Sequence, residues 1–188
     1  MSKAIYVVEY RKVSQGIGVL DRMFKQANLI LLYASPICIG KYLICVGGDV
    51  ADVYEAKAAA EQDEDGPPLA GHLLRRAHTN ILAYFKGKLP QLDLKPDAIG
   101  IFETRNAASG FVSLDAALKQ AQVDVAKLWL GQLLGGKFCY VLGGSTSDIE
   151  TAMYAAKGAI NESDLVGSRI VASPDADTLA RFYKGGGY

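Results

Sequence analysis

The sequence predicts an α+β sandwich, in which helices pack on a mainly antiparallel sheet, and it predicts that this fold occurs twice in the chain. The first observation is an internal repeat: residues 4–27 and residues 98–121 share 10 identities in 24 positions. The second is that both copies show the same succession of strand and helix patterns. We therefore expect two domains of about 90 residues each, residues 1–94 and residues 95–188.

The elements of the first copy follow from periodicity and propensity. β-branched and aromatic runs predict strands, and apolar residues at helical spacing predict helices, with Ser14 and Asp49 as helix N-caps. The acidic stretch at residues 61–68, which ends in Gly-Pro-Pro, predicts a solvated loop. In order, we expect strand 4–10, helix 14–27, strands 29–33 and 42–46, helix 50–60, strand 73–78 and a short C-terminal helix 81–86.

Composition and charge exclude several classes of protein. The chain carries 20 basic and 20 acidic residues, so it lacks the basic surface that nucleic-acid binding requires. Its longest uncharged stretch, residues 26–40, is 15 residues long, whereas a membrane span needs about 20. Three irregularly spaced cysteines argue against a disulfide framework. We expect a soluble protein from a reducing compartment that binds neither nucleic acid nor membrane.

The motifs do not indicate an enzyme. Residues 131–137 superficially match a phosphate-binding loop, but Phe138 stands where a magnesium-binding Ser or Thr would be, and a strand pattern follows. The two histidines, His72 and His78, have no counterparts in the second copy. Glu9 and Glu103 lie at equivalent strand ends, where we expect ion pairs, for instance with the neighbouring Arg11 and Arg105, rather than acid–base chemistry.

The turn at residues 36–41, between two apolar strand patterns, is unusual because it is apolar and carries a thiol, Cys38. Cys45 and Cys139 lie inside strand patterns, where buried, inert thiols are expected. One chain cannot build a metal site from Cys38 alone, but three chains around a threefold axis could hold a [4Fe–4S] cluster whose fourth iron stays open. The alternative is that Cys38 simply lines a turn or a pore.

The repeated motifs resemble those of the bacterial microcompartment (BMC) shell domain. They are Glu-x-Arg near the first strand end, Asp21 followed by Lys25-Gln26-Ala27-Asn28, and Gly40-Lys41 followed by Gly47-Gly48. The second copy repeats them with Asp115, Lys119, Ala121, Gly136-Lys137 and Gly143-Gly144. Both copies together cover nearly the whole chain. The unpermuted order and the cysteine-bearing turn are most similar to the propanediol-utilisation type of tandem shell protein.

The resemblance implies a homotrimer of two-domain chains that mimics a hexagonal tile of a microcompartment shell in the bacterial cytoplasm. It further implies one [4Fe–4S] cluster per trimer, held by Cys38, for electron transfer or cluster delivery across the shell. Implied partners are neighbouring shell proteins, edge to edge, and enclosed redox enzymes. The implied pore-lining residues are Ile37, Ile39, Gly40, Leu133, Leu134 and Gly135, and the implied tile-edge residues are Lys25, Lys119 and Arg76.

Two alternatives remain from the sequence. The first is a metal-free tile whose pore gates the passage of metabolites. The second is a ferredoxin-like sensor that binds a small ligand between its repeats and never forms sheets.

Overall fold

A computed structural model describes residues 4–87, 96–131 and 134–183. The predicted boundary between the two domains, at residues 94 and 95, lies outside the described residues. The fold class is confirmed: each copy runs strand, helix, strand, strand, helix, strand, and ends in a short helix.

The first copy follows this order with a short 3₁₀ turn, η1, between its two middle strands. Its elements are β1 (Ala4–Tyr10), α1 (Val13–Gln26), β2 (Ile30–Ile37), η1 (Cys38–Gly40), β3 (Lys41–Gly48), α2 (Val50–Glu61), β4 (Ala70–Leu74) and α3 (Thr79–Phe85).

The second copy has the same order, with a 3₁₀ turn before its last strand. Its elements are β5 (Ala98–Thr104), α4 (Ala107–Gln120), β6 (Asp124–Leu130), β7 (Phe138–Gly144), α5 (Thr146–Gly158), η2 (Glu162–Asp164), β8 (Leu165–Ala172) and α6 (Ala176–Tyr183).

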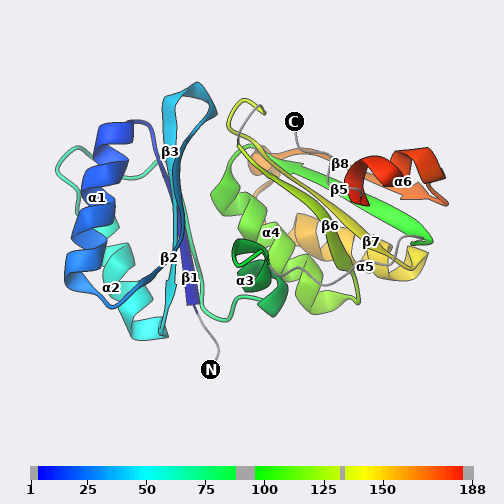
Figure 1. The fold of residues 1–188 in the computed structure, drawn as a ribbon, viewed down its shortest axis with the longest axis horizontal. Coiled ribbons are helices and arrows are strands. Elements are labelled where there is room, and N and C mark those ends of the chain that lie inside the picture. The colour runs from blue at the N-terminus through cyan, green and yellow to red at the C-terminus, as the bar shows by residue number, and fades with distance from the viewer. Residues whose placement is uncertain (1–3, 88–95, 132–133, 184–188) are drawn as a thin grey trace.

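Each copy forms a four-stranded antiparallel sheet with the same strand order, β2-β3-β1-β4 and β6-β7-β5-β8. The two long helices of each copy cover one face of its own sheet, which we call the inner face. The opposite face of each sheet is the outer face. The four layers stack as α1/α2, first sheet, α4/α5 and second sheet (Figure 1).

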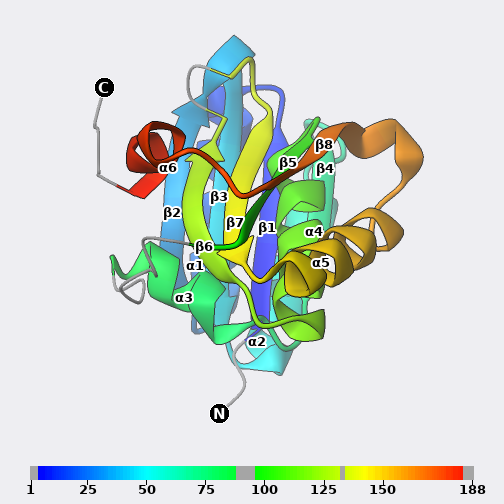
Figure 2. The same ribbon diagram turned by 90° about the vertical axis from the view of Figure 1, so that its right-hand side faces the viewer.

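Helix α4 joins the two copies, because it packs between its own sheet and the outer face of the first sheet (Figures 1 and 2). Ile5 and Val7 of β1 and Leu43 of β3 therefore share one apolar core with Phe111 and Leu118 of α4. The inner face of the first sheet has a separate core with α1 and α2. The two copies therefore pack against each other through a shared hydrophobic core.

Two strand predictions need correction. Strand β2 continues through Pro36, which pairs with Tyr42, so the turn is shorter than expected. A proline is tolerated there because β2 is an edge strand. Strand β4 ends at Leu74 rather than at residue 78. Its Ala-Gly-His start has little strand propensity, and pairing with β1 determines its position instead.

The loop after α2 and the start of α1 also differ from expectation. The acidic loop is not merely solvated, because Arg22 donates to Asp63 Oδ1 at 2.7 Å and Gln15 donates to Asp63 Oδ2 at 2.8 Å. These bonds fasten the loop to α1. Helix α1 begins at Val13, so Lys12 rather than Ser14 is its N-cap.

Within the described part of the chain, no helix combines the length and the apolar character that crossing a membrane requires.

Candidate functional site

The two turns that the sequence analysis assigned to a pore lie next to each other at one end of the molecule (Figures 1 and 2). We call the turn of residues 37–41 the first tip, and the described residues between β6 and β7, Gly131 and 134–137, the second tip. The N–H of Cys38 donates to the carbonyl of Gly131 at 3.4 Å, and Lys41 Nζ donates to the carbonyl of Gly136 at 3.3 Å. The copies therefore present their tips as one paired surface.

Cys38 begins the 3₁₀ turn of the first tip and is half-buried. Gly40 ends this turn with a φ of +71°, a backbone conformation that glycine adopts without strain. Gly135 in the second tip has a φ of +62°. A Cβ on either glycine would meet no atom within 4 Å, so both positions face open space within one chain. Within one chain, the thiol of Cys38 therefore lies on a tip with free space beside Gly40.

The other predicted pore residues divide into three groups. Gly40 and Gly135 are exposed and Leu134 is half-buried. Ile37 is only 4% exposed, and a Cβ on Gly131 would lie 3.0 Å from its Cδ1 atom, so the Ile37 side chain supports the tip from beneath instead of lying on its surface. Ile39 lies in the 3₁₀ turn, and Leu133 lies outside the described residues.

The remaining two thiols are unsuited to metal binding in their resting state. Cys45 is completely buried in β3, and burial raises the pKa of its thiol well above the usual range. Burial, followed by the nearby Glu103 carboxylate, raises the pKa of Cys139 to about 11. A thiolate is the form that ligates metal. Cys38 is therefore the thiol whose position suits a ligand.

The predicted edge residues are accessible. The Lys25 side chain is 73% exposed and its ammonium lies 2.5 Å from Asp21 Oδ2. Lys119 is less exposed and pairs with Asp115, which also accepts the backbone N–H of His78 from the first copy at 2.8 Å. Arg76 is exposed in the turn after β4. Lys25 and Arg76 lie on the surface, whereas Lys119 also neighbours the contact between the copies.

A buried carboxylate fastens the two copies together, and the sequence analysis missed its role. Glu9 is completely buried; its Oε1 accepts the N–H of Ala107, the first residue of α4, and its Oε2 lies 2.9 Å from Lys41 Nζ. The predicted ion pair of Glu9 with Arg11 is wrong, because Lys41 takes that place. The predicted pair of Glu103 with Arg105 is also wrong, because Lys137 Nζ lies 2.9 Å from Glu103 Oε1. The signal available in the sequence was that Glu and Lys recur together in both copies.

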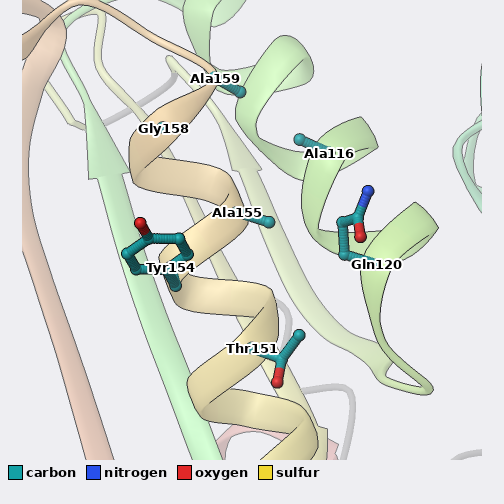
Figure 3. Close-up of a pocket in the computed structure, with 7 residues that line it drawn as sticks. All are labelled: Ala116, Gln120, Thr151, Tyr154, Ala155, Gly158 and Ala159. Carbon is teal, nitrogen blue, oxygen red and sulfur yellow. The ribbon is translucent and has the colours of Figure 1, made fainter.

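A shallow groove of about 370 Å³ lies between α4 and α5 (Figure 3). Most of the residues that line it have small side chains, and none of them is charged. The lining residues are Ala116, Gln120, Thr151, Tyr154, Ala155, Gly158 and Ala159. Among the described residues of one chain, no group of three or more His, Cys, Asp or Glu side chains could hold a metal ion. The described residues 134–137 lead into strand β7 rather than into a helix, whereas a phosphate-binding loop is followed by a helix N-terminus.

Comparison with known proteins gives consistent results. The BMC domain model matches residues 4–76 and again residues 98–174. The chain is 33% identical over 177 residues to the bacterial microcompartment shell protein PduT of Citrobacter freundii, covering 91% of this chain and 92% of that protein. A crystal structure of a microcompartment protein from Desulfitobacterium hafniense superimposes with a TM-score of 0.86 at 32% identity, over 96% of this chain and 99% of the other.

A more distant structure shares the fold alone. The fused permuted hexameric shell protein MSM0275 from the RMM microcompartment has a TM-score of 0.60 at 20% identity, over 84% of this chain and 83% of the other.

These relationships confirm the family recognised from the sequence, the tandem α+β fold, a structural rather than enzymatic role, and a location in microcompartment shells within the bacterial cytoplasm. The chain belongs to the BMC domain family, as a shell protein with two BMC domains in tandem.

Proposed function

We propose that this shell protein is a homotrimeric tile whose three Cys38 thiolates hold one [4Fe–4S] cluster on the central threefold axis. In this assembly the paired tips of each chain surround the axis, so six turns alternate between a cysteine-bearing and a cysteine-free sequence. Neighbouring tiles meet at edges that include Lys25, Lys119 and Arg76. The tile serves electron transfer or cluster delivery across the shell, and redox enzymes enclosed by the shell are its functional partners.

The observation that carries the proposal is the position of Cys38 in the first tip. The second tip lies beside it and has no cysteine. Iron–sulfur clusters are held by cysteine thiolates, and three thiolates leave one iron open to another ligand. A threefold axis supplies three such ligands from one cysteine per chain. The residues around Cys38 fit this role, because Gly40 and Gly135 leave room and the buried Ile37 provides an apolar support.

The chain's own contribution is to position and protect the ligands. The bond from the Cys38 N–H to Gly131 and the bond from Lys41 to Gly136 fix the first tip against the second. Apolar surroundings and hydrogen bonds near the ligand sulfurs tune the reduction potential of such a cluster. When bound, the cluster supplies one-electron redox chemistry that the side chains of this protein lack.

Replacement of Cys38 by serine tests the proposal. We expect anaerobically purified protein of the unmodified sequence to contain iron and to be brown, and the Cys38→Ser variant to lose iron and the visible absorbance while keeping its oligomeric state. The matched control is Cys139→Ser, because that thiol is partly buried in β7 and should not affect iron content. Iron retained by the Cys38→Ser variant would sink the assignment.

The second candidate is a metal-free tile whose pore gates metabolites. The half-buried Leu134 in the second tip favours it, because apolar side chains there narrow an opening without any metal. This candidate predicts no visible absorbance and no iron in the unmodified protein, even after reconstitution with iron and sulfide under anaerobic conditions.

A further inference from the structure

We propose that Lys41 is a positioning residue for the cluster site: its ammonium group, held between the buried Glu9 and the second tip, directs positive charge toward the tips and raises the reduction potential of the cluster. This inference rests on the proposed cluster and deepens it by naming a residue that sets its potential. Lys41 acts through the charge that it places beside the Cys38 ligand and is not itself a ligand.

The position of Lys41 links it to both tips. It is the first residue of β3 and directly follows the 3₁₀ turn that Cys38 begins. Its Nζ donates to the carbonyl of Gly136 at 3.3 Å. A Cβ on Gly136 would lie 3.0 Å from Lys41 Nζ and 3.1 Å from the carbonyl oxygen of Cys38, so both atoms border the same small space. The ammonium group therefore lies between the tips, beside the backbone of Cys38.

The carboxylate that pairs with Lys41 is shared with a second positive group. Glu9 is completely buried, and its Oε2 lies 2.9 Å from Lys41 Nζ. Its other oxygen, Oε1, accepts the backbone N–H of Ala107 at the N-terminus of α4, where the helix dipole is positive. Glu9 therefore does not fully cancel the charge of Lys41. Because Lys41 contacts Glu9 on one side and Gly136 on the other, the ion pair presents its positive end to the tips.

A positive charge at this place favours the reduced form of a cluster, because one-electron reduction adds one negative charge to the site. The net charge of the site and the hydrogen bonds to the sulfurs are among the factors that set the potential of iron–sulfur clusters. The Lys41 side chain is 15% exposed, so solvent and salt screen its charge weakly. In a trimer the threefold axis repeats this charge three times around one cluster.

Redox titrations of variants with opposite charge changes test the inference. Lys41→Gln removes the cation and leaves the carboxylate, so the reduction potential should fall. Glu9→Gln removes the carboxylate but keeps an oxygen that accepts the N–H of Ala107, so the potential should rise. At the midpoint potential of the unmodified trimer, we expect the ratio of reduced to oxidised cluster to change about tenfold in each variant, a size typical of one charge at an effective dielectric constant of about 20. A tenfold change corresponds to about 59 mV for a one-electron couple.

The opposite signs separate an effect of charge from an effect of folding, because damage to the packing gives no reason for the two variants to shift in opposite directions. The double variant Glu9→Gln/Lys41→Gln should return close to the unmodified potential, and Lys41→Arg, which keeps the charge, should retain it. The control is Lys57→Gln, which removes a lysine that pairs with Glu61 on α2, away from the tips (Figure 1), and should leave the potential unchanged.

Circular dichroism and iron content establish that each variant is folded and loaded before its titration, and Glu9→Gln decides the sign if Lys41→Gln does not fold. Unchanged potentials in the iron-loaded Glu9 and Lys41 variants, or shifts of the same sign, would overturn the role of Lys41 and leave the proposed cluster in place. An unmodified trimer that contains no iron and takes up none on reconstitution would overturn the proposed function, and this inference with it.

Discussion

At the scale of single residues, duplication has placed the same ion pair in two environments. Glu9 is completely buried between Lys41 and the first N–H of α4, whereas Glu103 and Lys137 remain partly exposed in one chain. The sequence shows both pairs of residues but not the difference between them, because burial depends on which sheet α4 covers. The residue types in the sequence predict an ion pair in each copy. Only the packing shows that one pair is buried and the other is partly exposed.

This difference predicts unequal effects of removing the two lysines. Lys41→Met leaves the buried Glu9 carboxylate without its cation and should cost about 3 kcal/mol of unfolding free energy. The matched change Lys137→Met affects an exposed pair and should cost less than about 1 kcal/mol. Both are measured by urea denaturation at a protein concentration low enough to keep the chain monomeric. Equal losses for the two variants would contradict the assigned burial.

The ionisation of Asp63 gives a residue-scale prediction for pH. Burial alone would raise the pKa of Asp63, but hydrogen bonds from Gln15 and Arg22 outweigh it and lower the pKa from 3.8. A carboxyl group with a lowered folded-state pKa adds stability above its unfolded pKa, and this stability disappears as the pH falls through the folded value. Asp63→Asn should therefore flatten the acid limb of the stability curve below about pH 4. An unchanged acid limb in thermal melts would argue against the network.

At the scale of elements, the two copies share a close approach of a helix to its sheet. A Cβ on Gly16 would lie 2.4 Å from Tyr42 Cδ1, and a Cβ on Gly110 would lie 2.2 Å from Phe138 Cδ1. Each glycine lets a helix lie against an aromatic ring of the middle strand. The two glycines occupy equivalent positions of the internal repeat. The sequence alone does not show whether a glycine in a helix allows a close approach to the sheet or only weakens the helix.

Alanine substitutions separate these two roles of glycine in a helix. Gly110→Ala should destabilise the fold by about 2 kcal/mol, because the ring of Phe138 must move within a packed core. Gly18→Ala is the control: its Cβ would meet nothing within 4 Å, so α1 should gain about 0.5 kcal/mol from better helix propensity. Thermal unfolding measures both. A neutral Gly110→Ala variant would show that the helix can withdraw from the sheet at no cost.

The boundaries of helices and strands were predictable where the hydrophobic pattern of the sequence agrees with the strand pairing in the structure. The order of strands and helices and helix α2 followed from periodicity, and the short helix α3 was expected two residues late. Strand β4 was placed too late because its residues have weak strand propensity and β1 determines their position. Strand β2 was predicted to end at residue 33, whereas it continues through Pro36 to Ile37, because an edge strand accepts a proline.

At the scale of the whole molecule, the repeat predicted two domains but not how they meet. The structure adds that α4 of the second copy covers the first sheet, that Glu9 fastens its N-terminus, and that the two tips lie side by side. These contacts join residues roughly a hundred positions apart. They could not be read from the sequence because neither periodicity nor local propensity carries information about such distant pairs.

The same scale explains how duplication lets one tip specialise. A ring of identical single domains would repeat every tip six times, whereas a tandem chain alternates two sequences around the axis. Cys38 in the first tip and Leu134 in the second can therefore change independently, while the ion pair of Glu and Lys is kept in both copies. The central claim is that the cysteine-bearing set acts as a three-thiolate ligand.

The most direct test is the iron and acid-labile sulfide content of the anaerobically purified trimer, measured with its reduced-state electron paramagnetic resonance spectrum. The account predicts about four iron atoms and four sulfides for every three chains, and a signal typical of a reduced [4Fe–4S] cluster. An iron-free trimer that also fails to take up iron and sulfide on anaerobic reconstitution would contradict it.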